Sequence, residues 1–226
     1  MGRIAILGGT GPEGIGLGLR FALAGEEVVV GSRQAERAQD AARDMRATLA
    51  TVGCQTPVHG ADNAGAIAGA DIVTVAFPYA GVADLLPGLA ALLAGKVVLD
   101  VINPLTRINK VFGLTPVAEG SAAEAIQQLL PESFVVAGFK NESAEELVEI
   151  AHPVEGDVIV CGDHAEAKGR IVDLVRRIPN YRAVDAGALL NARFTEGITA
   201  MLLNINRRHK AITSVRILGL DDGGTH

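Results

Sequence analysis

The sequence predicts an α/β fold in which a parallel sheet is covered by helices on both faces, the doubly wound arrangement. Short apolar runs rich in valine and isoleucine recur along residues 1–150, and segments of helical length separate them. Strands that are apolar throughout are typical of a parallel sheet buried on both sides. A second observation is the opening of the chain, where the apolar run 3–7 is followed at once by Gly8-Gly9-Thr10-Gly11-Pro12-Glu13-Gly14.

The glycines of this opening have the GxGxxG spacing of a dinucleotide-binding turn, formed by Gly9, Gly11 and Gly14. In such a turn, backbone N–H groups and the amino end of the next helix receive a pyrophosphate. Pro12 suits the first helical turn because its missing N–H would have no intrahelical partner there. Strand 3–7 precedes the turn, a helix over 15–24 follows it, and a second strand occupies 27–30. The sequence thus predicts a Rossmann-type sheet that binds a nicotinamide or adenine dinucleotide.

The end of the second strand favours NADP over NAD. Sites selective for NAD usually carry Asp or Glu here to hold the ribose 2′-hydroxyl, whereas this chain has Gly31-Ser32-Arg33-Gln34. A guanidinium matches the geometry of a 2′-phosphate, Arg37 follows Arg33 by one helical turn, and Ser32 adds a hydroxyl donor. The alternative is that both arginines are solvated at a helix start, although cations there oppose the helix dipole.

The remaining elements alternate in the same way. After a helix over 35–51 we expect a weak strand at 56–58, a helix over 63–67 and a strong strand at 71–76. A helix over 82–93, a strand at 96–101, a helix over 121–130 and a strand at 134–139 complete an NADP-binding domain of residues 1–150. The smaller region 151–220 should hold strands at 157–161 and 182–184, a helix over 165–177 and a long helix over 189–208. The apolar stripe of that last helix predicts core or a dimer interface, and the tail 221–226 is expected to be disordered.

Ligands of a doubly wound sheet lie beyond the carboxyl ends of its strands. Besides the glycine turn and the segment 32–33, the segments that follow strands are 77–79, 103–105 and 138–141. Pro78 and Pro104 each stiffen a loop on the side where the nicotinamide should lie. The alternative for both is an ordinary turn proline.

The composition and the absence of several motifs exclude some classes of function. The net charge of −6 gives no reason to expect nucleic acid or an anionic membrane as partner, and two cysteines imply no disulfide framework. No apolar run reaches spanning length and the chain opens on its first strand without a basic leader, so we expect a cytoplasmic protein. Cys161 and His164 have the spacing of half a zinc site, but no second ligand pair follows, so no metal is expected. A dehydrogenase that acts on a carbonyl needs a general acid or base. Hydride exchange between two heterocyclic cofactors instead needs the two rings to be stacked at a short distance, so for that reaction we predict no catalytic side chain.

Together these residues resemble the NADPH-dependent reductases of coenzyme F420, also called F420H2:NADP oxidoreductases. The stretches 7–11 and 31–33 are shared with many Rossmann reductases. More specific similarities are Ser121-Ala122-Ala123-Glu124, Val160-Cys161-Gly162-Asp163, Asp185-Ala186-Gly187 and Leu190-Asn191-Ala192-Arg193, and the resemblance extends to Leu220.

The resemblance implies a small homodimeric enzyme that passes a hydride between NADPH and a deazaflavin. The residues it assigns to NADP are Thr10, Ser32, Arg33 and Arg37 for the 2′-phosphate, Gly9, Gly11 and Pro12 for the pyrophosphate, and Ala76, Phe77, Pro78 and Tyr79 for the nicotinamide side. The deazaflavin would lie between the Asn103 loop, the loop 138–141 and the final helix.

One position departs from the family pattern, in which the loop after the sixth strand typically carries a histidine close to the deazaflavin. This chain has Lys140 there. We expect its side chain to emerge at the mouth of the nicotinamide cleft and to stabilise the anionic reduced ring. The alternative is a solvated loop lysine. The departure leaves other functions open: an NADPH-dependent reductase of a free flavin, a ferric chelate or an imine, or an NADP-binding regulatory protein without turnover.

Overall fold

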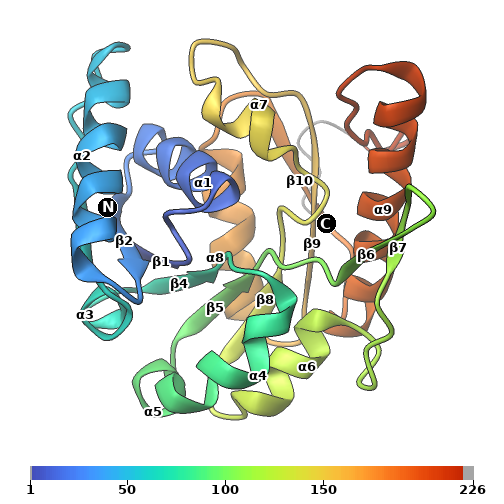
Figure 1. Cartoon of the computed structure of the whole chain (residues 1–226), viewed down its shortest axis with the longest axis horizontal. Helices are drawn as coiled ribbons and strands as arrows, with labels where there is room; N and C mark the ends of the chain where they lie inside the picture. Colours follow the sequence, from blue (N-terminus) through green and yellow to red (C-terminus); the bar gives the residue numbers. More distant parts are fainter. Residues whose placement is uncertain (1, 221–226) are drawn as a thin grey trace.

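The structure, a computed structural model, describes residues 2–220, so the predicted disordered tail 221–226 lies outside the described residues. One eight-stranded sheet forms the centre, in the order β10-β9-β8-β5-β4-β1-β2-β3, and helices cover both of its faces (Figure 1). Neighbouring strands run parallel except for β8 and β9, which are antiparallel. The predicted doubly wound α/β fold is confirmed, with this one reversal in an otherwise parallel sheet.

The elements follow the chain in regular alternation. The strands of the large sheet are β1 (Arg3–Leu7), β2 (Glu27–Ser32), β3 (Val58–Asp62), β4 (Ile72–Val75), β5 (Val97–Asp100), β8 (Phe134–Ala137), β9 (Gly156–Gly162) and β10 (Tyr181–Asp185). The α-helices are α1 (Pro12–Leu23), α2 (Ala35–Ala50), α3 (Asn63–Ile67), α4 (Val82–Leu85), α5 (Ala90–Leu93), α6 (Ala122–Leu129), α7 (Ala144–Val148), α8 (Ala165–Arg176) and α9 (Ala192–His209).

Successive side chains of each strand belong alternately to two apolar layers of the core. On β1, Ile4 and Ile6 belong to an apolar cluster that includes residues of α1, α2 and α8. Ala5 and Leu7 belong to a second cluster, which includes residues of α3, α4, α5 and α6. Successive side chains of a strand point to opposite faces, so every buried strand contributes to both layers. Both faces are therefore closed, and the ends of the strands are left for ligands.

Four local features differ from the expectations. The predicted helix over 82–93 is interrupted at Pro87, where a 3₁₀ turn (Pro87–Leu89) separates α4 from α5, because proline lacks the N–H that a continuous helix needs. The hairpin of β6 (Leu105–Ile108) and β7 (Val111–Leu114) was not expected; its turn residues Asn109 and Lys110 both have positive φ, as a tight hairpin turn demands. The short helix α7 was also missed, and the weak strand expected at 56–58 forms at 58–62 instead.

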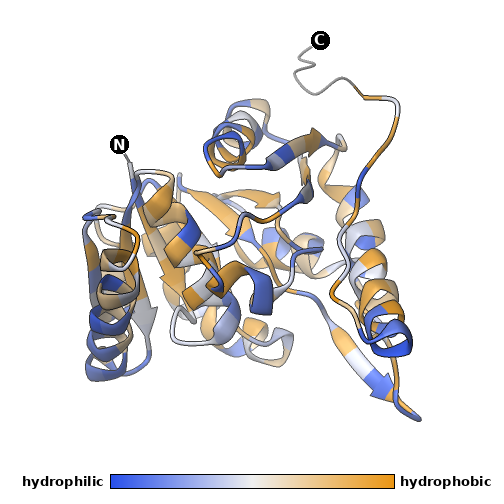
Figure 2. Cartoon of the chain, turned by 90° about the horizontal axis from the view of Figure 1, so that it is seen from above, coloured by the Kyte–Doolittle hydropathy of each residue, from blue (hydrophilic) through white to orange (hydrophobic). Residues whose placement is uncertain are grey.

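The last third of the chain adds two strands to the sheet and then forms the long helix α9. β9 and β10 extend the sheet beyond β8, while α9 packs against β7 and the amino end of α6. The β6–β7 hairpin projects from the body beside α9 (Figure 2). α9 and the hairpin therefore stand next to the carboxyl ends of the central strands.

Candidate functional site

A first cavity, of about 700 Å³, lies at the carboxyl ends of β1, β2 and β4. It is lined by Gly8, Thr10, Gly11, Ser32, Arg33, Gln34, Arg37, Asn63, Ala76, Phe77, Pro78, Gly81, Asp84 and Leu85. Three segments far apart in the sequence thus meet: the glycine turn, the start of α2 and the loop after β4. These segments are the ones that the sequence assigned to the 2′-phosphate, the pyrophosphate and the nicotinamide.

Close backbone contacts explain the glycine turn. Gly8 has a φ of +78°, and a Cβ atom there would lie 2.7 Å from the carbonyl oxygen of Ala76. A Cβ atom on Gly14 would lie 2.6 Å from Cα of Gly9. No side chain caps the amino end of α1, which begins at Pro12, so N–H groups of its first turn remain free to bind an anion.

Two cations stand at the end of β2 without a protein partner. Arg33 and Arg37 are exposed, and neither guanidinium makes an ion pair or a hydrogen bond within residues 2–220. The hydroxyl of Ser32 accepts a hydrogen bond from the backbone N–H of Gln34, at 3.3 Å. No side chain caps α2 either. Unpaired cations beside an uncapped helix start favour an anionic ligand over the alternative of solvated arginines.

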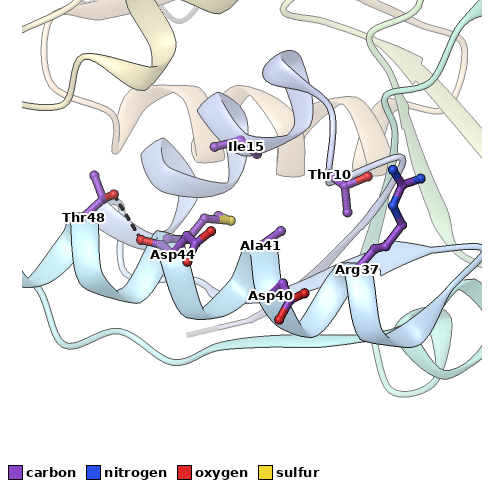
Figure 3. A pocket seen from close by; sticks show the side chains of 8 residues that line it. Thr10, Ile15, Arg37, Asp40, Ala41, Asp44 and Thr48 are labelled. Carbon is purple, nitrogen blue, oxygen red and sulfur yellow. Dashed lines mark hydrogen bonds between the residues drawn. The ribbon is translucent and has the colours of Figure 1, made fainter.

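A groove of about 420 Å³ between α1 and α2 continues from the first cavity. Figure 3 shows Arg37 at the start of α2 with its guanidinium beside Thr10 of the glycine turn. These two residues line both hollows. Further along α2, Asp40 and Asp44 line the groove and leave it acidic. The end near Thr10 and Arg37 is therefore the part of the groove that carries a cation next to a hydroxyl.

Some predicted residues shape the first cavity without lining it. Gly9 and Gly14 are buried in the turn, and Pro12 is exposed at the first position of α1. Tyr79 starts a 3₁₀ turn and packs partly buried against the second apolar cluster. Burial raises the pKa of its phenol, and the carboxyls of Glu119 and Glu196 raise it further.

A second cavity, of about 380 Å³, lies between the Asn103 loop, the loop after β8 and α9. The family resemblance implies that the deazaflavin lies between these segments. Polar residues on its wall include Asn103, Asn141, Thr199, Glu13 and Glu142. Glu13 lies in the first turn of α1, two residues after Gly11 of the first cavity, so the two cavities adjoin at this turn.

Three carboxyls line the second cavity, those of Glu13, Glu142 and Glu145, and the first two have raised pKa values. Burial raises the pKa of Glu13 to about 8, and the charge of Glu142 contributes to the rise. Burial also raises the pKa of Glu142 to about 7, against the opposing effect of a hydrogen bond from Tyr181. Neither residue was singled out from the sequence. A glutamate such as Glu13 is usual in the first turn of a helix as a partner of the helix dipole. Glu142 lies in a loop, where acidic side chains are usually solvated.

The expected position of the Lys140 side chain is wrong. Lys140 is 1% exposed, and its Nζ lies 2.7 Å from Oδ2 of Asp100 and 3.0 Å from Oε1 of Glu196. Nζ also donates a hydrogen bond to the carbonyl of Ile102. Burial raises the pKa of Glu196, and the charge of Lys140 opposes that rise. The ammonium is fully engaged inside the protein and does not reach the cavity, so we no longer count Lys140 among the cofactor-binding side chains.

The backbone explains why Lys140 turns inward. Phe139 has a φ of +56°, so the chain changes direction directly after β8. The Phe139 ring packs edge-on against Phe21 and Tyr181, which holds this conformation. The backbone carbonyl of Lys140 accepts hydrogen bonds from Asn103 Nδ2 (2.8 Å) and from the Thr199 hydroxyl (2.6 Å). Lys140 therefore supports the wall of the second cavity from behind.

Two further observations bear on the function. No cluster of three or more His, Cys, Asp or Glu side chains that could hold a metal occurs among residues 2–220. Over the same residues, no helix is both long and apolar enough to span a membrane.

A Rossmann sheet whose dinucleotide cavity adjoins a second cavity is the architecture of an NADP-dependent oxidoreductase, and comparison with known proteins defines which one. The family described as "NADP oxidoreductase coenzyme F420-dependent" matches residues 3–104. F420-dependent NADP reductases of Methanocaldococcus jannaschii and Methanothermobacter thermautotrophicus are 36% and 38% identical to this chain. Each alignment covers 97% of this chain, together with 99% and 96% of the relative. The chain belongs to the F420-dependent NADP oxidoreductase family.

Solved structures agree with this assignment. A candidate F420-dependent NADP reductase from Arthrobacter sp. FB24 has a TM-score of 0.76 at 28% identity, and the match covers 95% of this chain and 98% of that one. A reductive aminase of Aspergillus terreus matches with a TM-score of 0.62 at 17% identity, which shows a shared fold alone. The family and the fold expected from the sequence are confirmed.

Proposed function

We propose that this protein transfers a hydride between NADP(H) and the deazaflavin coenzyme F420. The observation that carries the proposal is the meeting of the two cavities at the first turn of α1, with Gly11 in one and Glu13 in the other. A dinucleotide bound at this turn would lie close to an acceptor in the second cavity, and direct hydride transfer requires its nicotinamide to stack on that acceptor. The names of the relatives, which cover the chain almost completely, support the same substrates.

Each part of the first cavity has a role in holding the dinucleotide. Arg33 and Arg37 would pair with the 2′-phosphate, with Ser32 and Thr10 as hydroxyl donors. The free N–H groups at the start of α1 would bind the pyrophosphate. Ala76, Phe77 and Pro78 would form the apolar wall beside the nicotinamide, which supplies the hydride when it is bound.

The second cavity fits a flat, polar acceptor. Leu202 and Leu203 of α9 contribute apolar surface, while Asn103 and Asn141 contribute carboxamides. The buried ion pairs of Lys140 fix the loop after β8, and the hydrogen bond from Asn103 to its carbonyl fixes the neighbouring loop. This support holds the wall in place while the acceptor is oriented and water is excluded.

This assignment gives two parts of the chain different roles. Residues 1–150 would form the NADP-binding domain, and residues 151–220 would complete the acceptor site and a homodimer. The surface that we assign to the partner subunit consists of the β6–β7 hairpin and the adjoining face of α9. Its apolar side chains Ile108, Val111, Phe194 and Met201 are exposed, and an isolated two-stranded sheet gains stability when it is covered.

The test is an absorbance assay of NADPH oxidation with four acceptors. The proposal predicts rapid oxidation with F420 and little or none with flavin mononucleotide, a ferric chelate or a cyclic imine. Oxidation with one of those acceptors but not with F420 would refute the substrate assignment. Tight NADPH binding without oxidation by any acceptor would instead favour a regulatory protein.

A further inference from the structure

Direct hydride transfer leaves two carboxyls of the second cavity without a role. Glu13 comes from the first turn of α1 and Glu142 from the loop after β8, and both line the same cavity. The charge of Glu142 acts on Glu13, so the two groups lie within electrostatic reach of each other. Both are partly buried. Two neighbouring acids in a cavity rarely ionise together, because like charges repel in a poorly solvated place.

The groups around Glu142 are acidic or neutral. Asn141 Nδ2 donates a hydrogen bond to its Oε1 at 2.8 Å, and Tyr181 of β10 donates another. Glu146 of α7 and Asp157 of β9 act on Glu142 as further negative charges. No cation is among the groups that shift the pKa of Glu142.

The buried cation of this region is already engaged. Arg20 of α1 acts on Tyr181 and Glu146, but its guanidinium donates hydrogen bonds to four backbone carbonyls between Glu146 and His152. Arg20 thus fixes the segment around α7 and leaves the carboxyl pair uncompensated. With the pKa of Glu13 raised to about 8 and that of Glu142 to about 7, the pair retains roughly one proton near neutral pH.

Two residues of this cavity wall carry a carboxamide oxygen without a donor among the described residues. Asn141 is 3% exposed and uses Nδ2 for the carbonyl of Asp157 and for Glu142, and its Oδ1 has no donor among the described residues. Asn103 likewise uses Nδ2 for the carbonyl of Lys140 and leaves Oδ1 without a donor. Buried carboxamide oxygens are normally hydrogen-bonded, so this part of the cavity wall is rich in acceptors and short of donors, and the two oxygens offer no N–H or O–H group that would favour ionised carboxylates.

We propose that Glu13 and Glu142 form an acid pair that exchanges one proton with the hydride acceptor in the second cavity. The inference rests on the proposed function and departs from the prediction that no catalytic side chain is present, because the reduced acceptor takes up one proton after the hydride. The hydride leaves NADPH, which is oxidised, and its electron pair comes to rest on a ring nitrogen of the reduced acceptor. The carboxyl O–H bond then breaks, an N–H bond forms on that nitrogen, and the carboxylate regains its proton from solvent.

The first experiment follows the acid pair in the protein without any substrate. Glutamate labelled with ¹³C at its carboxyl carbon allows each side chain to be titrated by NMR. In the parent protein we expect two resonances with midpoints near pH 7 and pH 8. Glu142→Gln should remove one of them and move the other to lower pH, because a neighbouring charge is lost. Glu132→Gln, an exposed change at the opposite end of β8, should alter neither. Titration of both carboxyls below pH 5 would overturn the proposal.

The second experiment measures F420 reduction against pH at saturating NADPH. The rate should fall above the higher midpoint in the parent enzyme, since the protonated pair is needed in this direction. Glu13→Gln should lower the rate at pH 7 by about a hundredfold and abolish this pH dependence. An unchanged rate and pH profile in Glu13→Gln would overturn the proton exchange. If the parent enzyme showed both NMR midpoints but did not reduce F420, the proposed function would be refuted. The finding that Glu13 and Glu142 share a proton would still stand.

Discussion

Removing the Lys140 ammonium should unfold the protein more readily rather than alter hydride transfer alone. Nζ lies 2.7 Å from Asp100 and 3.0 Å from Glu196, and all three side chains are at most 1% exposed. Loss of one partner of a buried ion pair leaves uncompensated charge and typically costs 3–5 kcal/mol. Lys140→Met leaves two carboxyls facing each other, although Glu196 can take up a proton. We therefore expect a loss of about 3 kcal/mol in the free energy of unfolding at pH 7.

Urea unfolding followed by circular dichroism measures this loss. Lys168→Met is the matched control, since Lys168 pairs with Asp185 near the surface and its removal should cost under about 1 kcal/mol. Adding Glu196→Gln to Lys140→Met should restore part of the stability, because one of the two unpaired charges disappears. If Lys140→Met unfolded within 1 kcal/mol of the parent protein, the assignment of Lys140 to a structural ion cluster would be wrong.

Further predictions concern the cofactor, the pH dependence of stability and the subunit contact. Arg33→Ala should weaken NADPH binding by about ten- to a hundredfold, as expected for lost charge-assisted hydrogen bonds, and leave NADH nearly unchanged; Arg43→Ala on the exposed side of α2 is the control, and equal losses for both cofactors would contradict the assignment. The pKa of Glu142 rises from 4.5 to about 7 on folding, so its stabilising effect is complete below pH 4.5 and is lost as the pH rises through 7. The free energy of unfolding measured with urea should therefore fall by up to about 3 kcal/mol between pH 5 and pH 8 in the parent, and by less in Glu142→Gln; identical falls would exclude this cause. Met201→Lys should convert a dimer to monomers in light scattering, and a parent protein that is already monomeric would refute the proposed interface.

The sequence predicts best what depends on local constraints. The strand 3–7, the glycine turn and the arginines after β2 lie within a short stretch of chain, and the backbone contacts of Gly8 and Gly14 leave few alternatives. Because strands of a parallel sheet end at one edge, the loops of Ala76–Pro78 and Asn103 could also be assigned to the ligand side.

Features that depend on distant partners could not be predicted in the same way. The position of Lys140 depends on Asp100 at the end of β5, Glu196 of α9 and the positive φ of Phe139. Two charged residues following neighbouring apolar strands, Asp100 and Lys140, are the one signal that could have indicated the pair. Glu13 and Glu142 are far apart in the sequence, and only the fold brings them to one cavity.

The most direct test of the account is the fate of the transferred hydrogen. NADPH that carries deuterium at both C4 positions of the nicotinamide is mixed with F420 and enzyme, and the reduced deazaflavin is analysed by mass spectrometry. Direct transfer between adjoining cavities predicts that the deuterium appears on carbon in the reduced deazaflavin. Reduced deazaflavin without deuterium, or NADPH consumed with no deazaflavin reduced, would contradict the proposed hydride transfer.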